Sequence, residues 1–150
     1  MKNANNKIGI KSLICGFTLV ELLVVVAIIG IIVGIVMGNI NTAKQKANDA
    51  RRMSDIKSIQ NALGLYQTGK GQYPFMMDGY ITGTDILSQS LVSELVVKTM
   101  PMDPINKDIG VLPYKYHYKS VDGSDYVLGF CLETNTISSH SKGCGNELKP

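Results

Sequence analysis

The longest apolar run in the chain extends from Phe17 to Met37 and contains one charged residue, Glu21. At 1.5 Å of rise per residue, a helix of this length spans about 31 Å, which matches the hydrocarbon core of a bilayer. The run therefore predicts a membrane-spanning helix. The only charged residues before it are three lysines, and this basic flank predicts an N-terminus in the cytoplasm and a body outside.

After residue 38 the pattern changes to apolar residues at steps of three or four, which predicts an amphipathic helix over residues 39–67. No proline interrupts residues 17–66, so a single long helix is expected to end near Gly69, Gly71 and Pro74. Its apolar positions are Ile40, Ala43, Ala47, Ala50, Met53, Ile56, Ile59, Leu63 and Tyr66.

A second, short helix is predicted over residues 85–97. Leu87, Leu91 and Leu95 recur there at helical spacing, and Thr84 can cap the first turn.

Two alternating stretches predict strands of a small antiparallel sheet. Residues 114–119 read YKYHYK, with tyrosines on one face, and residues 126–132 alternate large apolar residues in the same way. The sequence SVDGSD between them is typical of a hairpin connection. Residues 68–150 are therefore predicted to form a head, and the fold class is α+β.

The formal charge of +3 is carried by the N-terminal segment, because the twelve basic residues beyond it balance twelve acidic ones. The body thus lacks the basic excess that indicates a nucleic-acid partner. A mixed cluster on the long helix is either a DNA-binding stripe or a solvated face with intrahelical ion pairs, and its alternating signs favour the solvated face. The cluster consists of Lys44, Lys46, Asp49, Arg51, Arg52, Asp55 and Lys57.

The chain has three cysteines, Cys15, Cys131 and Cys144. If the segment that contains Cys15 is removed, an even pair remains, and an even pair in an exported domain predicts one disulfide. Closing such a loop contributes about 3 kcal/mol in the chain-entropy model. Two free thiols are the alternative.

The N-terminal segment differs from an ordinary secretory signal, whose apolar part is followed by a small-residue cleavage site. Here the small residue, Gly16, precedes the apolar run. Cleavage after Gly16 would keep the run on the mature chain and give Phe17 a new α-amine. Glu21 would lie one turn away on the same face, where the amine and the helix macrodipole both favour a carboxylate. The alternative is a charge tolerated at the membrane edge.

Gly30, Gly34 and Gly38 recur at intervals of four and share one helical face. Small residues at this spacing allow close helix packing in a membrane. Glycine is also simply common in membrane helices, and loosening of the helix at Gly38 is a third interpretation.

No catalytic motif is recognisable: the sequence has no G-x-S-x-G elbow, phosphate loop or metal-spaced Cys/His set. Asp122 and Asp125 are weak calcium candidates, because calcium takes six to eight oxygen ligands and a β-turn explains Asp-Gly without a metal. We therefore expect neither an enzyme nor a cofactor.

The sequence GFTLVELLVVVAIIGIIVG, from Gly16 to Gly34, resembles the N-terminal signature of type IV pilins and of type II secretion pseudopilins. The resemblance implies a membrane prepilin peptidase that cuts after Gly16 and N-methylates Phe17. It also implies that Glu21 docks each incoming subunit against the N-terminal amine of its neighbour. The PMDP element at residues 101–104, followed by the two alternating stretches, is similar to the small heads of major pseudopilins.

The resemblance implies a pilin-like organisation along the chain. Residues 1–16 would be a removable leader, residues 17–38 the transmembrane and assembly segment, residues 39–67 the amphipathic half of the helix, and residues 68–150 the head.

The implied function is that of a structural subunit of a membrane-anchored helical filament, either a type II secretion pseudopilus or a type IV pilus. Expected partners are copies of the chain itself, minor pilins or pseudopilins, the prepilin peptidase, the inner-membrane assembly platform and the cytoplasmic membrane, but not nucleic acid. The alternative is a single-pass, membrane-anchored extracytoplasmic binding domain that never polymerises. Such a domain would need neither Gly16 before Phe17 nor Glu21.

Overall fold

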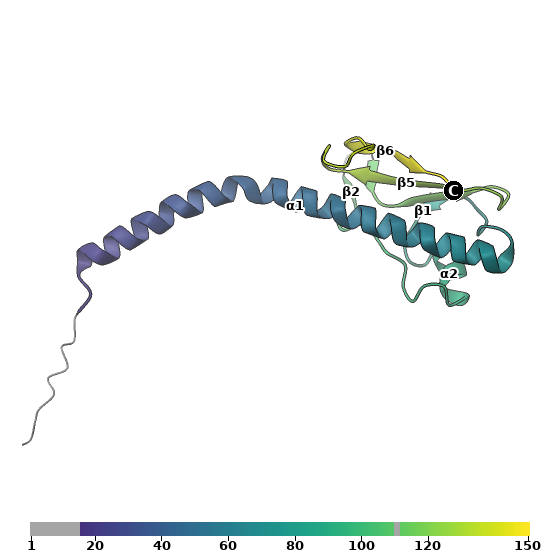
Figure 1. The fold of residues 1–150 in the computed structure, drawn as a ribbon, viewed down its shortest axis with the longest axis horizontal. Coiled ribbons are helices and arrows are strands. Elements are labelled where there is room, and N and C mark those ends of the chain that lie inside the picture. Colours follow the sequence, from purple (N-terminus) through teal and green to yellow (C-terminus); the bar gives the residue numbers. More distant parts are fainter. Residues whose placement is uncertain (1–15, 110–111) are drawn as a thin grey trace, which may run out of the picture. The chain divides into compact units, whose positions relative to one another are not determined.

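The computed structural model of the protein describes residues 16–109 and 112–150. The fold is α+β, as predicted, and the chain divides into two compact units at Ile40 and Asn41. Figure 1 labels the elements, which are α1 (Leu19–Lys70), β1 (Met76–Tyr80), α2 (Ile86–Ser93), β2 (Lys107–Ile109), β3 (Leu112–Tyr114), β4 (His117–Ser120), β5 (Val127–Leu132) and β6 (Gly143–Leu148).

The first unit contains the apolar part of helix α1. Its segment Leu19–Met37 has a mean hydropathy of 3.1, and none of it is buried in the described structure. The large apolar side chains of this segment are between 44% and 78% exposed. Continuous apolar exposure of this kind is unfavourable in water, so the segment is suited to a membrane or to packing against other chains.

The second unit, Asn41–Pro150, is the head, and here α1 packs through a face that includes Ile56, Ile59 and Leu63. All three side chains are almost fully buried. The prediction that the same face begins at Ile40 was wrong, because four positions, Ile40, Ala43, Ala47 and Ala50, are exposed. The physical reason is geometric: each step of three residues falls about 60° short of a full turn, so a row of such steps winds around the helix.

The sheet of the head is antiparallel, with strand order β1-β4-β5-β6, and β2 and β3 form a separate two-stranded ladder. Figure 1 shows the head half of α1 alongside the four-stranded sheet. Tyr118 and Leu128 of the sheet, and Tyr116 directly before β4, are fully buried in one core with the apolar residues of α1 and α2. Burial raises the pKa of Tyr118, whose hydroxyl donates a hydrogen bond of 2.9 Å to the Pro74 carbonyl oxygen.

The predicted hairpin is confirmed, because β4 and β5 pair as antiparallel neighbours with His117 opposite Gly129. Tyr116 and Tyr118 point into the core as the alternation predicts, whereas Tyr114 belongs to β3 and is only half-buried. The outer strands β1 and β6 were not predicted.

Helix α2 is shorter than predicted and has a different cap. Asp85, rather than Thr84, caps it: the Asp85 carboxylate accepts hydrogen bonds from the backbone N–H of Ser88 (3.0 Å) and from the Ser88 hydroxyl (2.6 Å). Leu95 was predicted on the buried face but is 90% exposed. It follows the end of α2 at φ +57°, and the Val96 N–H bonds to the Leu91 carbonyl, which is the closing bond of a Schellman motif.

Candidate functional site

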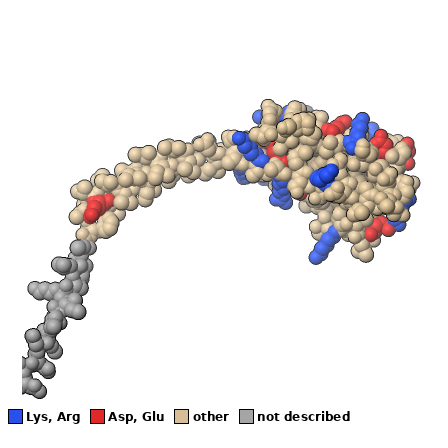
Figure 2. Space-filling model, in the orientation of Figure 1, with Lys and Arg blue, Asp and Glu red and all other residues tan. Residues whose placement is uncertain are grey.

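The segment before and within the first turn of α1 holds the predicted processing and assembly residues. Gly16 and Phe17 lie directly before the helix, and both are exposed. Thr18 precedes the first helical residue, and Glu21 lies in the first turn. Figure 2 shows acidic side-chain atoms near the start of the otherwise uncharged apolar part of α1, and the sequence has one acidic residue in this segment, Glu21.

Thr18 and Glu21 form a capping box. The Thr18 N–H and the Thr18 hydroxyl donate to Glu21 Oε2 at 2.9 and 2.8 Å, and the Glu21 N–H donates to Thr18 Oγ1 at 3.2 Å. Such reciprocal bonds satisfy backbone N–H groups that a helix start leaves without partners. Both side-chain bonds end on Oε2, so Oε1 accepts no hydrogen bond within the described residues.

Sequence reasoning missed the role of Thr18, although its T-x-x-E spacing is the known signal of a capping box. The capping box gives Glu21 a structural use within one chain. An experiment therefore has to distinguish this capping role from any ion pair that Glu21 forms with a neighbouring chain.

The three glycines of the predicted packing face lie within α1, which continues through them without a break. A Cβ atom added at Gly30 or Gly34 would meet nothing within 4 Å. Their lack of a side chain is thus not required by contacts inside this chain.

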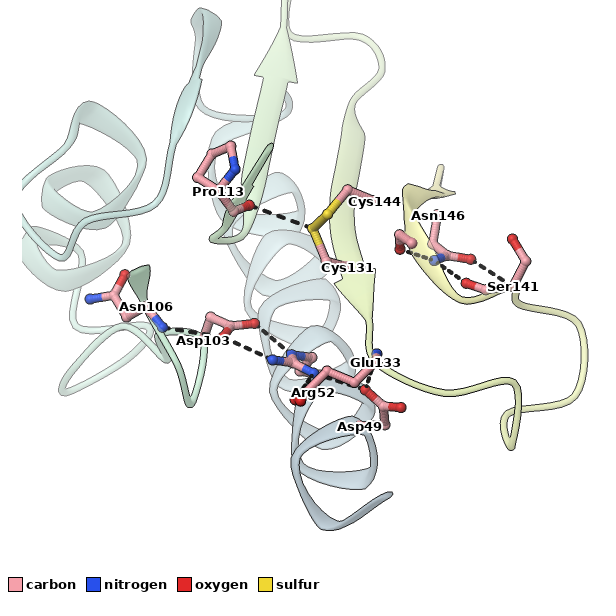
Figure 3. Close-up of a disulfide and its surroundings, with 11 residues drawn as sticks. Asp49, Arg52, Asp103, Asn106, Pro113, Cys131, Glu133, Ser141, Cys144 and Asn146 are labelled. Carbon is pink, nitrogen blue, oxygen red and sulfur yellow. Dashed lines mark hydrogen bonds and ion pairs between the residues drawn. A yellow bond between two sulfur atoms is a disulfide. The ribbon is translucent and has the colours of Figure 1, made fainter. Parts of the chain in front are cut away.

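A buried charged cluster joins α1 to the rest of the head (Figure 3). Arg52 donates from Nε to Asp103 Oδ2 at 2.6 Å and from Nη1 to Asp49 Oδ1 at 2.8 Å. Nη1 also donates to Glu133 Oε1 at 2.9 Å. The guanidinium lies 5.1 Å from the centre of the Tyr114 ring, so it bridges the helix, the loop before β2, the end of β5 and β3.

The prediction of a solvated helix face was wrong for Asp49 and Arg52, whose side chains are fully buried. It was right for Arg51, which is 66% exposed and lies 3.9 Å from Asp55 as an intrahelical ion pair. Asp49 and Arg52 are three positions apart, a spacing that is also common for exposed ion pairs on a helix. Their further partners, Asp103 and Glu133, lie 51 and 81 residues beyond Arg52 in the sequence.

Hydrogen bonding decides the ionisation of this cluster. Burial opposes the charge of Asp49, but hydrogen bonds from the Glu133 N–H, from the hydroxyl and N–H of Thr134 and from Arg52 outweigh it and lower the pKa of Asp49. Burial likewise opposes the charge of Arg52, and the bonds to Asp103 and the other carboxylates raise its pKa above the usual value. Asp49 and Arg52 therefore both stay charged throughout the neutral range.

In the structure a disulfide joins Cys131 of β5 to Cys144 of β6, which are separated by 13 positions (Figure 3). The Cys131 sulfur also lies 3.5 Å from the Pro113 carbonyl oxygen of β3. The bond thus holds an edge strand of glycine-rich sequence to the centre of the sheet. The third cysteine of the sequence, Cys15, lies outside the described residues.

The calcium candidates lie in the loop between β4 and β5. Asp122 Oδ1 accepts hydrogen bonds from the N–H and the hydroxyl of Ser124 at 3.0 and 2.7 Å, and these bonds lower its pKa. Gly123 has φ +76°, and a Cβ there would lie 3.2 Å from the Tyr73 carbonyl oxygen, so the turn favours glycine at this position without any metal. Among the described residues, no three His, Cys, Asp or Glu side chains are placed to hold a metal ion.

Comparison with known proteins places these features in one family. A family model described as the prokaryotic N-terminal methylation motif matches residues 12–37. The type II secretion system core protein G of Escherichia coli is 33% identical over 98 residues, which are 62% of this chain and 68% of that protein. The protein of the same name from Vibrio cholerae is 32% identical over 97 residues, which cover 62% of this chain and 66% of that protein.

The protein of the same name from Aeromonas hydrophila is 39% identical over a shorter stretch of 64 residues, 43% of this chain and 45% of that protein. No solved structure matches the chain significantly. With an N-terminal methylation motif, a membrane-length apolar helix and 33% identity over 98 residues to a relative matched along 68% of its length, the chain belongs to the family of type II secretion system core protein G.

Proposed function

We propose that the chain is a structural subunit of the filament of a type II secretion system, the pseudopilus, rather than of a type IV pilus. The observation that carries this proposal is the joint match of the methylation motif, over residues 12–37, and of the relatives named as core protein G. The apolar segment Leu19–Met37, none of which is buried, supports it, because such a surface needs lipid or neighbouring subunits to cover it.

Maturation is the first step of the proposed function. Residues 1–16 are a leader that a prepilin peptidase removes after Gly16, and Phe17 becomes the N-methylated first residue. The mature chain then consists of a transmembrane segment over residues 17–38, an amphipathic helix over 39–67 and a head over 68–150. The single-pass helix keeps its N-terminus at the cytoplasmic side of the membrane and holds the head outside.

Assembly is the second step. The subunit polymerises with copies of itself and with minor pseudopilins, on an inner-membrane assembly platform. When subunits meet, Glu21 faces the α-amine of Phe17 on a neighbouring chain, and the Oε1 atom that the capping box leaves unused is available for this contact. Gly30, Gly34 and Gly38 permit close approach of neighbouring helices. The role is structural rather than catalytic and requires no cofactor.

Mass spectrometry of the membrane-extracted protein, combined with imaging of filaments, tests the proposal. A mature chain that begins with N-methylated Phe17 and a Gly16→Leu variant that stays uncut are the expected results. A mature chain that begins elsewhere, or a wild-type protein that is cut correctly yet never polymerises with the rest of the system present, contradicts it. The second result would favour a membrane-anchored binding domain.

A further inference from the structure

Two lysines mark the end of the head unit where α1 enters it. Lys44 and Lys46 are exposed, and residues 41–48 contain no acidic residue. Neither lysine has a hydrogen bond or an ion pair in the described part of the chain. The nearest carboxylate on the helix, Asp49, is buried and occupied by Arg52 and Thr134. These two cations therefore have no partner available on their own turn of the helix.

The opposite end of the head unit carries an acidic loop, residues 121–126. It lies beside the chain that follows α1, because the Tyr73 N–H donates a hydrogen bond of 2.8 Å to the Gly123 carbonyl oxygen. Asp122 and Asp125 are both exposed there. Among the described residues, the Asp125 carboxylate accepts no hydrogen bond and forms no ion pair, and only its backbone carbonyl is used, by the Ser120 hydroxyl.

A shallow hollow of about 260 Å³ opens between the two aspartates. Lys119 also lines it, so the hollow keeps one net negative charge. Val121, Tyr126 and Val127 add apolar wall to the same hollow. This combination suits the side chain of a lysine, whose aliphatic stem packs on apolar surface while its ammonium group seeks carboxylates.

The lysines and the hollow cannot meet within one chain. Lys46 and Lys70, at the end of α1, are separated by about 36 Å of helix. Figure 2 shows basic side chains where α1 enters the head unit and acidic side chains, among others, at the opposite end of that unit. The head therefore presents two complementary patches that point to different neighbours.

We propose that Lys44 and Lys46 of one subunit contact the Asp122–Asp125 hollow of a second copy of this chain. The inference rests on the proposed function as a filament subunit. Two different patches on one surface give a heterologous interface, which generates an open helical polymer when the rotation does not close. Exposed ion pairs are screened by salt and fix register and partner choice more than affinity. The contact thus sets the register of heads along the filament.

Disulfide crosslinking tests the proximity that the contact requires. A chain carrying both Lys46→Cys and Asp125→Cys, with the native Cys131–Cys144 bond left intact, is oxidised in filament-forming cells. A ladder of dimers and higher multimers on a non-reducing gel is expected. The matched control, Ser54→Cys with Asp125→Cys, moves the first cysteine about 12 Å along the same exposed helix and should give at least fivefold less multimer. Equal ladders from both chains, or none from either, overturn the contact.

Charge reversal tests its energetic role. Lys46→Glu alone and Asp125→Lys alone should each reduce filament number severalfold at low salt, while the double variant should restore at least half of it. Cleavage and membrane levels should be equal in all chains. Reversals without effect, or a double variant no better than the single ones, overturn the contact. Loss of membrane retention by Lys46→Glu, without crosslinks, also overturns it, because the lysines would then bind anionic lipid headgroups.

The outcomes separate this contact from the function on which it rests. If wild-type chains polymerise and the reversals polymerise equally well, the contact is refuted and the filament function stands. If wild-type chains never polymerise, the filament function itself is refuted.

Discussion

Arg52 is held between three carboxylates at a depth where its charge has no access to water. Replacing it with alanine leaves Asp49 and Asp103 buried without their cation. Breaking a buried pair in this way typically costs about 3–5 kcal/mol. We therefore expect Arg52→Ala to lower the free energy of unfolding of the head by about that amount, measured by chemical denaturation of the detergent-solubilised chain.

Arg51→Ala is the matched control, because Arg51 is the adjacent residue and its side chain, unlike that of Arg52, is 66% exposed where it pairs with Asp55. Exposed pairs contribute less than about 1 kcal/mol. Equal losses in the two variants would show that the buried cluster does not stabilise the head.

The buried cluster around Arg52 also makes the stability of the head depend on pH, through Asp49. The pKa of Asp49 is lower in the folded head than its ordinary value of 3.8. A lowered pKa in the folded state contributes stability that is fully present above the unfolded value and is lost as the pH falls through the folded value. Head stability should thus decrease as the pH drops below about 4. In Asp49→Asn this part of the decrease should disappear, and an unchanged acid transition in that variant would contradict the assignment.

Some functional and structural residues could be predicted from the sequence, and others could not. Gly16, Phe17 and Glu21 could be proposed as processing and assembly residues from sequence because their signature is local, with basic segment, glycine and apolar run in consecutive positions. The burial of Asp49 and Arg52 was not predictable, because their helical spacing is the same as that of an exposed pair. Only the fold brings Asp103 and Glu133 to them from distant parts of the sequence.

The C-terminal end of helix α2 closes with a Schellman motif, a position at which glycine is usually the most stable residue. The Schellman motif needs a left-handed residue, and Leu95 supplies it at φ +57° with its side chain 90% exposed. Glycine adopts this conformation without the penalty of about 1–2 kcal/mol that a Cβ atom adds. Leu95→Gly should therefore raise the thermal midpoint of the head. Ser93→Gly, inside the helix, should lower it, and destabilisation by both would contradict the role given to Leu95.

Strand β6 depends on the disulfide that ties it to β5. Its sequence, GCGNEL, is polar and glycine-rich, so it has little apolar surface to bury. Replacing Cys131 and Cys144 together with serine should cost about 3 kcal/mol, as expected for a loop of this length. Peptide mapping of the exported protein under non-reducing conditions should find the two cysteines linked. Two alkylated free thiols would contradict the bond.

The elements differ in how far sequence could predict them. Strands β4 and β5 were found because large apolar or aromatic side chains recur at every second position, whereas MMDGY of β1 and GCGNEL of β6 lack this pattern and become strands by pairing with β4 and β5. Position 40 and the alanines after it were placed on the buried face because steps of three look helical. The sequence does not say which side of the helix the sheet covers.

In the whole molecule, the apolar segment and the head differ in how much of their apolar surface the described chain buries. The head buries its own core, while Leu19–Met37 buries none of its side chains within the described chain. Inside a bilayer or a filament, lipid or neighbouring helices cover this segment, and Glu21 is then a charge in a medium of low dielectric constant. We propose that this charge pairs with the α-amine of a neighbouring Phe17 when subunits meet.

The most direct test of that claim separates the charge of Glu21 from its capping bonds. Glu21→Gln keeps an oxygen that can accept from Thr18 but removes the charge, and Thr18→Ala removes both hydrogen bonds of the Thr18 hydroxyl but keeps the charge. With cleavage and membrane levels confirmed equal, filaments are counted for both variants and for the wild type. We expect Glu21→Gln to fail to assemble, because the amine of a neighbouring Phe17 is left charged and unpaired, while Thr18→Ala still assembles. Normal filaments from Glu21→Gln would contradict it.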